Sequence, residues 1–140
     1  GLKNVSEAAV LAANYVRQRL KTAFELPYDT VCMHECVFSA VRQLERGVSA
    51  LDAAKYLIDN GIHPPTVYFP LIVREAMMVE PTETETLETL DRFIDLMLEI
   101  DRLSRDDPQR VKEAPLTMPV KRLDEAKAAR ELKVRWTPQP

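Results

Sequence analysis

Two adjacent prolines place the strongest local restriction on how this chain can fold. Pro64 and Pro65 follow a helical pattern that ends at Asn60-Gly61, and a proline cannot continue a helix because it lacks the backbone N–H. The residue before a proline is also driven toward extended backbone. We therefore predict a helix that closes on a left-handed Gly61, followed by a short strand over residues 66–69.

Apolar residues recur at three- and four-residue steps in three stretches of sequence, including the one that ends at Gly61, which predicts helices. The three predicted helices run from Ser6 to before Leu26-Pro27, from Ser49 to Gly61, and from Thr82 to about Ser104. Two of them open on a capping box, a hydroxyl residue followed three positions later by an acidic one: Ser49 with Asp52, and Thr82 with Glu85.

Strands are predicted where β-branched and aromatic residues gather between turn signals. These stretches are residues 30–40, 66–69 and 76–79, the last two forming a hairpin. The predicted fold class is α+β, a short antiparallel or mixed sheet covered by helices over residues 1–107. Residues 108–140 are predicted to be a proline-rich C-terminal tail with a short helix near 123–131.

The composition excludes several classes of protein. With only three glycines the chain contains no dinucleotide fingerprint, Walker loop or Gly-x-Ser-x-Gly elbow. A net charge of −3 argues against nucleic acid as a partner. The longest apolar stretch, residues 67–73, is far shorter than the ~20 residues of a membrane span, and no secretion signal opens the chain, so we expect a cytoplasmic protein. The start at Gly1 without methionine suggests a piece of a longer protein.

Cys32, His34 and Cys36 alternate in the predicted strand, which invites a metal site. Alternate strand residues lie ~6.6 Å apart, so the two cysteines would be ~13 Å apart, whereas the ligands of one zinc ion lie within ~4 Å of each other. We therefore expect no metal and no disulfide, and small buried cysteines instead. A metal-dependent enzyme that adds His63 to this set is kept as an outlying alternative.

Histidines and carboxylates supply the other candidates for a site. His34 and Glu35 point to opposite faces of a regular strand, so one of them can look into a cleft. His63 is pinned by the two prolines that follow it, which suits a residue that must hold its position, although a helix C-terminal capping role explains it too. Residues 80–85 place hydroxyls and carboxylates at a predicted helix start, a pattern that helix capping largely explains.

The order and spacing of several short motifs resemble the C-terminal part of the glycine cleavage system P-protein, a glycine decarboxylase. The motifs are Asn14-Tyr15, Met33-His34-Glu35, residues 61–66, Tyr68-Phe69-Pro70 and residues 78–83. Residues 69–73 and 119–130 are similar to subunit 2 of the two-subunit bacterial form. Arg74 departs from the family pattern, which has proline at that place.

This resemblance implies the small C-terminal domain of an aspartate-aminotransferase-like (fold type I) enzyme that uses pyridoxal phosphate (PLP). The parent enzyme would decarboxylate glycine and transfer the aminomethyl group to the lipoyl arm of H-protein. Its implied partners are an upstream large PLP domain, P-protein subunit 1 and lipoylated H-protein. The PLP lysine would lie upstream, so none of the seven lysines here is assigned that role and the fragment alone is expected to be inactive and free of PLP.

Carried over by motif, the catalytic candidates are His34, Glu35, His63 and Thr66, with His63 and Thr66 expected nearest the chemistry. The candidates for the substrate or lipoyl cleft are Glu80, Thr82 and Glu83. The resemblance also predicts exposed apolar surface where the large domain would lie. The alternative is a stand-alone α+β protein-interaction module without catalysis.

Overall fold

The computed structural model describes residues 1–136 and contains a three-stranded antiparallel sheet with helices packed on it. The strands are β1 (Cys36–Ser39), β2 (Thr66–Val67) and β3 (Ala76–Val79). The helices are α1 (Leu2–Leu20), α2 (Val41–Leu44), α3 (Ala50–Asp59), α4 (Leu87–Asp106), α5 (Pro108–Lys112) and α6 (Glu125–Arg130). The predicted α+β class is confirmed, and the sheet is antiparallel rather than mixed.

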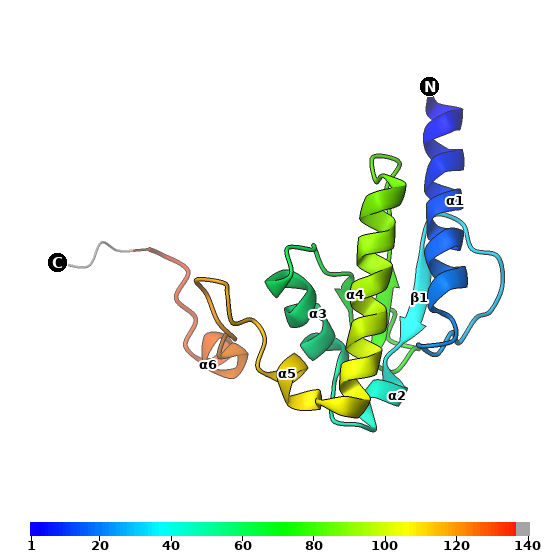
Figure 1. Cartoon of the computed structure of the whole chain (residues 1–140). Helices are drawn as coiled ribbons and strands as arrows, with labels where there is room; N and C mark the ends of the chain where they lie inside the picture. The colour runs from blue at the N-terminus through cyan, green and yellow to red at the C-terminus, as the bar shows by residue number, and fades with distance from the viewer. Residues whose placement is uncertain (137–140) are drawn as a thin grey trace.

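The sheet has β3 at its centre, paired with β1 on one side and β2 on the other. Cys36 lies opposite Val79 and Thr66 lies opposite Met78. The predicted hairpin of β2 and β3 is confirmed. In Figure 1, α4 lies in front of the sheet with α1 on one side and α3 on the other, and β1 is visible between α4 and α1. Side chains from the helices and the sheet form one hydrophobic core.

The core consists of large apolar side chains from every layer. Phe24 and Phe38 meet edge to face with ring centroids 6.4 Å apart. Each fully buried side chain of this size stabilises the fold by about 1.5–3 kcal/mol relative to an exposed one. The other large apolar side chains in the core that are essentially inaccessible are Val16, Leu20, Val48, Leu57, Met77, Ile94, Met97, Ile100 and Val111.

The predicted start and end of α3 are both confirmed. The Ser49 hydroxyl accepts the backbone N–H of Asp52 at 3.2 Å, and the Asp52 carboxylate accepts the backbone N–H of Ser49 at 2.9 Å. After the helix, Gly61 takes a left-handed φ of +73°, a conformation that costs glycine little because it has no Cβ. This end sets the direction in which the chain enters Pro64-Pro65.

The predicted starts of the other two long helices are wrong. Helix α1 begins at Leu2, so Ser6 lies inside it and donates its hydroxyl to the Leu2 carbonyl at 3.2 Å. Helix α4 begins at Leu87 with Thr86 as its N-cap, because the Thr86 hydroxyl accepts the N–H of Thr89 at 3.2 Å. The stretch before α4 contains three hydroxyl residues, Thr82, Thr84 and Thr86, and the pattern alone does not choose among them.

The strand predicted over residues 30–40 is reduced to Cys36–Ser39, so the alternation of Cys32, His34 and Cys36 on one strand is wrong. Strand β3 offers only four residues for pairing with β1. Cys32 pairs instead with the side chain of Asn14. Residues 26–35 therefore form a loop between α1 and β1.

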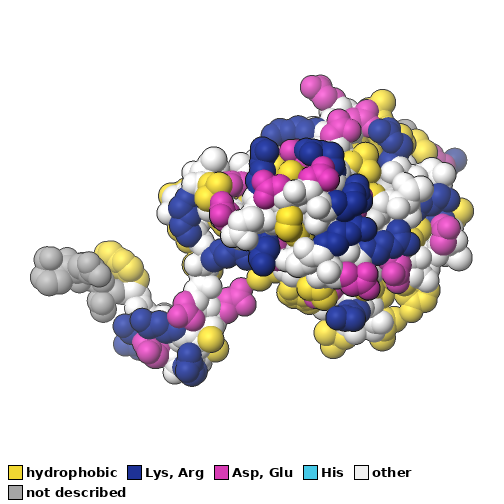
Figure 2. All heavy atoms as spheres, turned by 60° about the horizontal axis from the view of Figure 1, so that its bottom comes forward, with side chains coloured by type: hydrophobic (Ala, Val, Ile, Leu, Met, Phe, Trp, Pro, Cys, Tyr) yellow, Lys and Arg dark blue, Asp and Glu magenta, His cyan; other side chains and the backbone are white. Residues whose placement is uncertain are grey.

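The core continues past residue 107 into α5, which packs against α3 and α4. Val111 and Ala114 are buried in it, while the division of the chain into domains stays a prediction. We call residues 116–136 the C-terminal arm. Figure 2 shows α6 standing away from the body, and none of its residues is buried. Within the described residues, no helix is long and apolar enough to cross a membrane.

Candidate functional site

A cavity of about 370 Å³ lies where the turn after α3, the end of β3 and the start of α4 meet α1. Its walls include residues 61–65 and 79–81, together with Leu90 and Phe93 of α4 and Val16 of α1. Two predicted site residues, His63 and Glu80, line it. We call it the His63 cavity. The polar groups on its lining are His63, Glu80, Glu85, Thr89 and Arg92.

The backbone of His63 is held on both sides. Before it, the Ile62 N–H donates to the Leu57 carbonyl at 3.0 Å, and after it come the two prolines. The side chain itself is exposed at the mouth of the cavity. A restrained backbone and an accessible imidazole match the predicted presentation of this residue.

His34 lies beside Glu80, one of the residues that line the cavity. The His34 Nε2 atom lies 3.6 Å from Oε1 of Glu80, and their side chains are 56% and 55% exposed. The pairing of Cys36 with Val79 brings the two segments together, because Glu80 follows β3 and His34 precedes β1 by two residues. The structure thus brings His34 to Glu80, which lines the cavity together with His63, while His34 itself is not part of the lining.

The other predicted site residues do not line the cavity. Thr66, Thr82 and Glu83 are exposed, and the Thr82 hydroxyl bonds to that of Thr84 at 2.7 Å. Glu35 is half-buried and is also absent from the lining. The sequence motifs that contain these residues do not show which residue of each motif faces the cavity.

Three polar lining residues, Glu85, Thr89 and Arg92, were not among the predicted site residues, and the sequence pattern had assigned Glu85 to helix capping. The Thr89 hydroxyl donates to the Glu85 carboxylate at 2.8 Å, and Arg92 Nη2 donates to the Asn60 carbonyl at 2.6 Å. Arg92 thereby joins α4 to the end of α3. The sequence signal for these residues was the polar face around the start of α4. That signal could not be used because the predicted helix start was Thr82, whereas α4 begins at Leu87.

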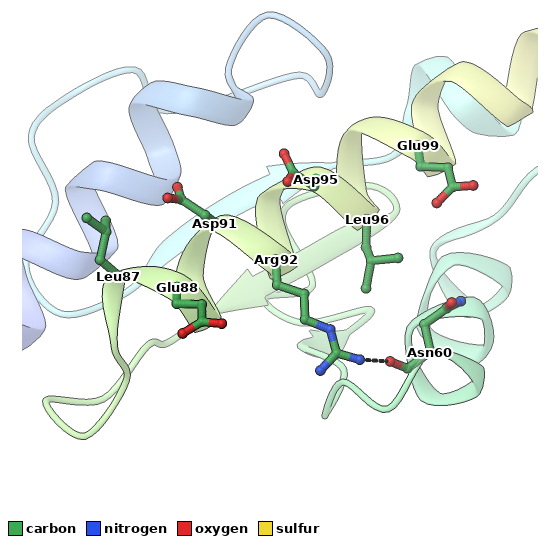
Figure 3. A pocket seen from close by; sticks show the side chains of 8 residues that line it. All are labelled: Asn60, Leu87, Glu88, Asp91, Arg92, Asp95, Leu96 and Glu99. Carbon is green, nitrogen blue, oxygen red and sulfur yellow. Dashed lines mark hydrogen bonds between the residues drawn. The ribbon is translucent and has the colours of Figure 1, made fainter.

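A second cavity of about 690 Å³ runs along α4 on the other side of Arg92 (Figure 3). The Tyr15 hydroxyl donates to Asp91 on this face at 2.5 Å, and that hydrogen bond is the main cause that raises the pKa of Tyr15. No predicted site residue lies here. Its lining consists of Asn60, Leu87, Glu88, Asp91, Arg92, Asp95, Leu96 and Glu99.

The cysteines do not supply a nucleophile or a metal site. Cys36 is buried, and burial raises the pKa of its thiol to about 12. Burial also raises the pKa of the half-buried Cys32. Both residues are free thiols. Among residues 1–136 no group of three or more His, Cys, Asp or Glu side chains is arranged to hold a metal ion.

The fold is that of a small α+β domain with a three-stranded antiparallel sheet. The family described as the C-terminal domain of glycine dehydrogenase matches residues 5–125, so the chain belongs to this family. This result confirms the resemblance seen in the motifs.

Individual relatives point to one subunit type. The probable glycine dehydrogenase (decarboxylating) subunit 2 of Staphylococcus aureus strain MRSA252 is 60% identical over 131 residues. The proteins of the same description from strains JH9 and Newman are equally similar. Each match covers 94% of this chain and 27% of the relative, so the chain spans about a quarter of the length of these relatives.

Proposed function

We propose that this chain acts as the C-terminal domain of a PLP-dependent glycine decarboxylase and forms one wall of the cleft in which glycine and the lipoyl arm of H-protein react. The observation that carries the proposal is the His63 cavity, where two separate family motifs contribute His63 and Glu80 to one opening. The 60% identity to glycine dehydrogenase subunit 2 supports the same assignment.

The residues of this cavity do not make a complete PLP site. PLP supplies an electron sink for the carbanion, and enzymes that use it hold it as a Schiff base on a lysine. Within the described part of the chain no lysine lines either of the two cavities. The cofactor lysine would therefore belong to the large domain of the parent enzyme, and we derive no step through PLP here.

The chain's own contribution is to bind, orient and exclude water. Arg92 carries a fixed positive charge suited to a carboxylate, and the ring nitrogens of the His63 imidazole can donate or accept a hydrogen bond. Pro64, Pro65 and Phe93 give the cavity apolar walls that displace water. A cavity with these properties suits the binding of a small amino acid or of the end of an aliphatic arm.

An apolar loop offers a contact surface for the rest of such an enzyme. Tyr68, Phe69, Leu71 and Ile72 lie between β2 and β3 and are 44% to 87% exposed. Tyr68 is held at a positive φ of 59°, which is costly for a bulky residue and persists where surroundings favour it. We propose that this loop packs against the large PLP domain or subunit 1 in a cytoplasmic complex with lipoylated H-protein.

The test is glycine–bicarbonate exchange by full-length subunit 2 together with subunit 1 and H-protein. If His63 handles a proton, His63→Ala should lower the exchange rate by about 100-fold. The control is Gln109→Ala, an exposed position on α5, which should leave the rate unchanged. Equal rates for His63→Ala and wild type would contradict the proposal.

A second candidate, a protein-interaction module without catalysis, is favoured by the C-terminal arm. Leu123, Leu132 and Trp136 are 66% to 84% exposed on it, and exposed apolar side chains of this kind often mark a partner's binding surface. If this candidate is right, removal of the arm abolishes binding to a partner subunit while His63→Ala leaves both binding and exchange intact.

A further inference from the structure

The loop of residues 26–35 carries His34 and has little backbone pairing of its own. Strand β1 begins only at Cys36, and the nearest bridge joins Glu25 to Ser39. Outside the helices and strands of residues 1–136, no backbone–backbone hydrogen bond uses residues 26–35. Side chains must therefore hold this loop in place.

Asn14 of α1 provides the most direct tether. Its Oδ1 atom accepts the backbone N–H of Cys32 at 3.1 Å, and its Nδ2 donates to the Cys32 carbonyl at 2.7 Å. The same Nδ2 donates to the Val10 carbonyl at 2.9 Å, which fixes the orientation of the amide on the helix. One carboxamide thus satisfies both backbone groups of Cys32, as a neighbouring strand would.

A second tether holds the loop at an earlier point. Arg17 pairs with Asp29, and Lys21 Nζ lies 3.9 Å from Oδ2 of the same carboxylate. His34 is two residues beyond Cys32, so their Cα atoms lie within about 7 Å of each other. Asn14 is accordingly the tether closest to His34 along the chain.

The side chain of His34 is largely exposed, so few contacts hold it. The position of the His34 side chain is therefore set by the backbone of the loop. Its contact with Glu80, a residue of the His63 cavity, is the ion-pair geometry described above. We infer that Asn14 is a positioning residue, which fixes Cys32 on α1 and thereby sets His34 beside Glu80 of the cavity lining. The inference rests on the proposed function of that cavity.

The first experiment replaces the donor without changing the size of the side chain. Asn14→Asp removes the N–H groups that serve Cys32 and Val10, and it should lower glycine–bicarbonate exchange by full-length subunit 2 with subunit 1 and H-protein about threefold to tenfold. Asn4→Asp is the control, since it makes the same change of charge at an exposed position on the same helix. It should leave the rate unchanged.

A double-mutant cycle separates positioning from a general loss of stability. If Asn14 acts through His34, the Asn14→Asp/His34→Gln enzyme should have the same rate as His34→Gln alone. Amide hydrogen exchange should become faster at Cys32, whose N–H bonds to Asn14, and stay as in wild type in α4. The inference would be overturned if the losses of rate caused by Asn14→Asp and by His34→Gln multiply in the double variant. It would also be overturned if Asn14→Asp keeps full activity.

The failure of this inference can be told apart from the failure of the proposed function. If His34→Gln keeps full activity while His63→Ala does not, the inference fails and the proposed function stands. If both variants keep full activity, the proposed function fails and the inference fails with it.

Discussion

The carboxylate of Asp59, at the end of α3, accepts the backbone N–H of Leu116 at 2.6 Å and so fixes the root of the C-terminal arm. Thr117 adds its own N–H at 2.7 Å and its hydroxyl at 2.5 Å. Partial burial would raise the pKa of Asp59, but the hydrogen bonds from Leu116 and Thr117 outweigh that effect and lower it.

Because the pKa of Asp59 is lower in the folded chain than its ordinary value of 3.8, its contribution to stability is present above pH 3.8 and is lost as the pH falls through the folded pKa. We predict that the amide resonances of Leu116 and Thr117 move together, with a midpoint below pH 3.8. Asp59→Asn should abolish that titration. A midpoint above 3.8 would contradict this account of the arm.

The two serines that precede helical patterns should respond differently to alanine. Ser49 is a true N-cap, so Ser49→Ala should cost about 1 kcal/mol of the free energy of unfolding. Ser6 lies inside α1, where alanine is a better helix former, so Ser6→Ala should be neutral or slightly stabilising. Urea denaturation of the two variants measures the difference, and equal losses would show that the assigned helix starts are wrong.

Neighbouring residues of β1 test the position of the core. Phe38 is fully buried, and Phe38→Ala should cost about 3–5 kcal/mol because it leaves a cavity against Phe24. Val37 is half-buried on the same strand, so Val37→Ala should cost about 1 kcal/mol. Denaturant titration gives both values. A larger loss at Val37 would mean that the register of β1 on β3 is shifted by one residue.

The cysteines should differ in their rate of reaction with a thiol reagent. At pH 8 a thiol with a pKa of about 12 is ionised in only about one molecule in ten thousand, and burial also excludes the reagent from Cys36. We predict slow reaction of Cys32, almost none of Cys36, and rapid reaction of both after denaturation. Two rapidly reacting thiols in the folded chain would contradict the placement of β1.

The predictions from the sequence succeeded where local chemistry left one choice. Gly61 and the two prolines after it allow one way to end α3, and Ser49 with Asp52 allows one way to begin it. They failed where neighbouring residues compete, as at Thr82 and Thr86, since each hydroxyl is able to cap a helix. In the structure Thr86 caps α4, since its hydroxyl accepts the N–H of Thr89.

The loop before β1 shows a different limit. Residues 30–35 have the composition of a strand, but pairing needs a partner, and β3 is long enough for only four residues. The Asn14 side chain takes the place of that partner at Cys32. The contact between His34 and Glu80 likewise depends on the register of β1 against β3, which lies beyond the reach of motif spacing.

The central claim, that this chain completes the cleft of a glycine decarboxylase, is tested most directly by reconstitution. PLP absorbance and glycine–bicarbonate exchange are measured for the chain alone, and again after it is mixed with the remainder of subunit 2, subunit 1 and H-protein. We predict that the chain alone neither binds PLP nor catalyses exchange. After mixing we predict exchange, at a lower rate when the chain carries His63→Ala. PLP binding or exchange by the chain alone, or a mixture whose exchange does not depend on the chain, would contradict the claim.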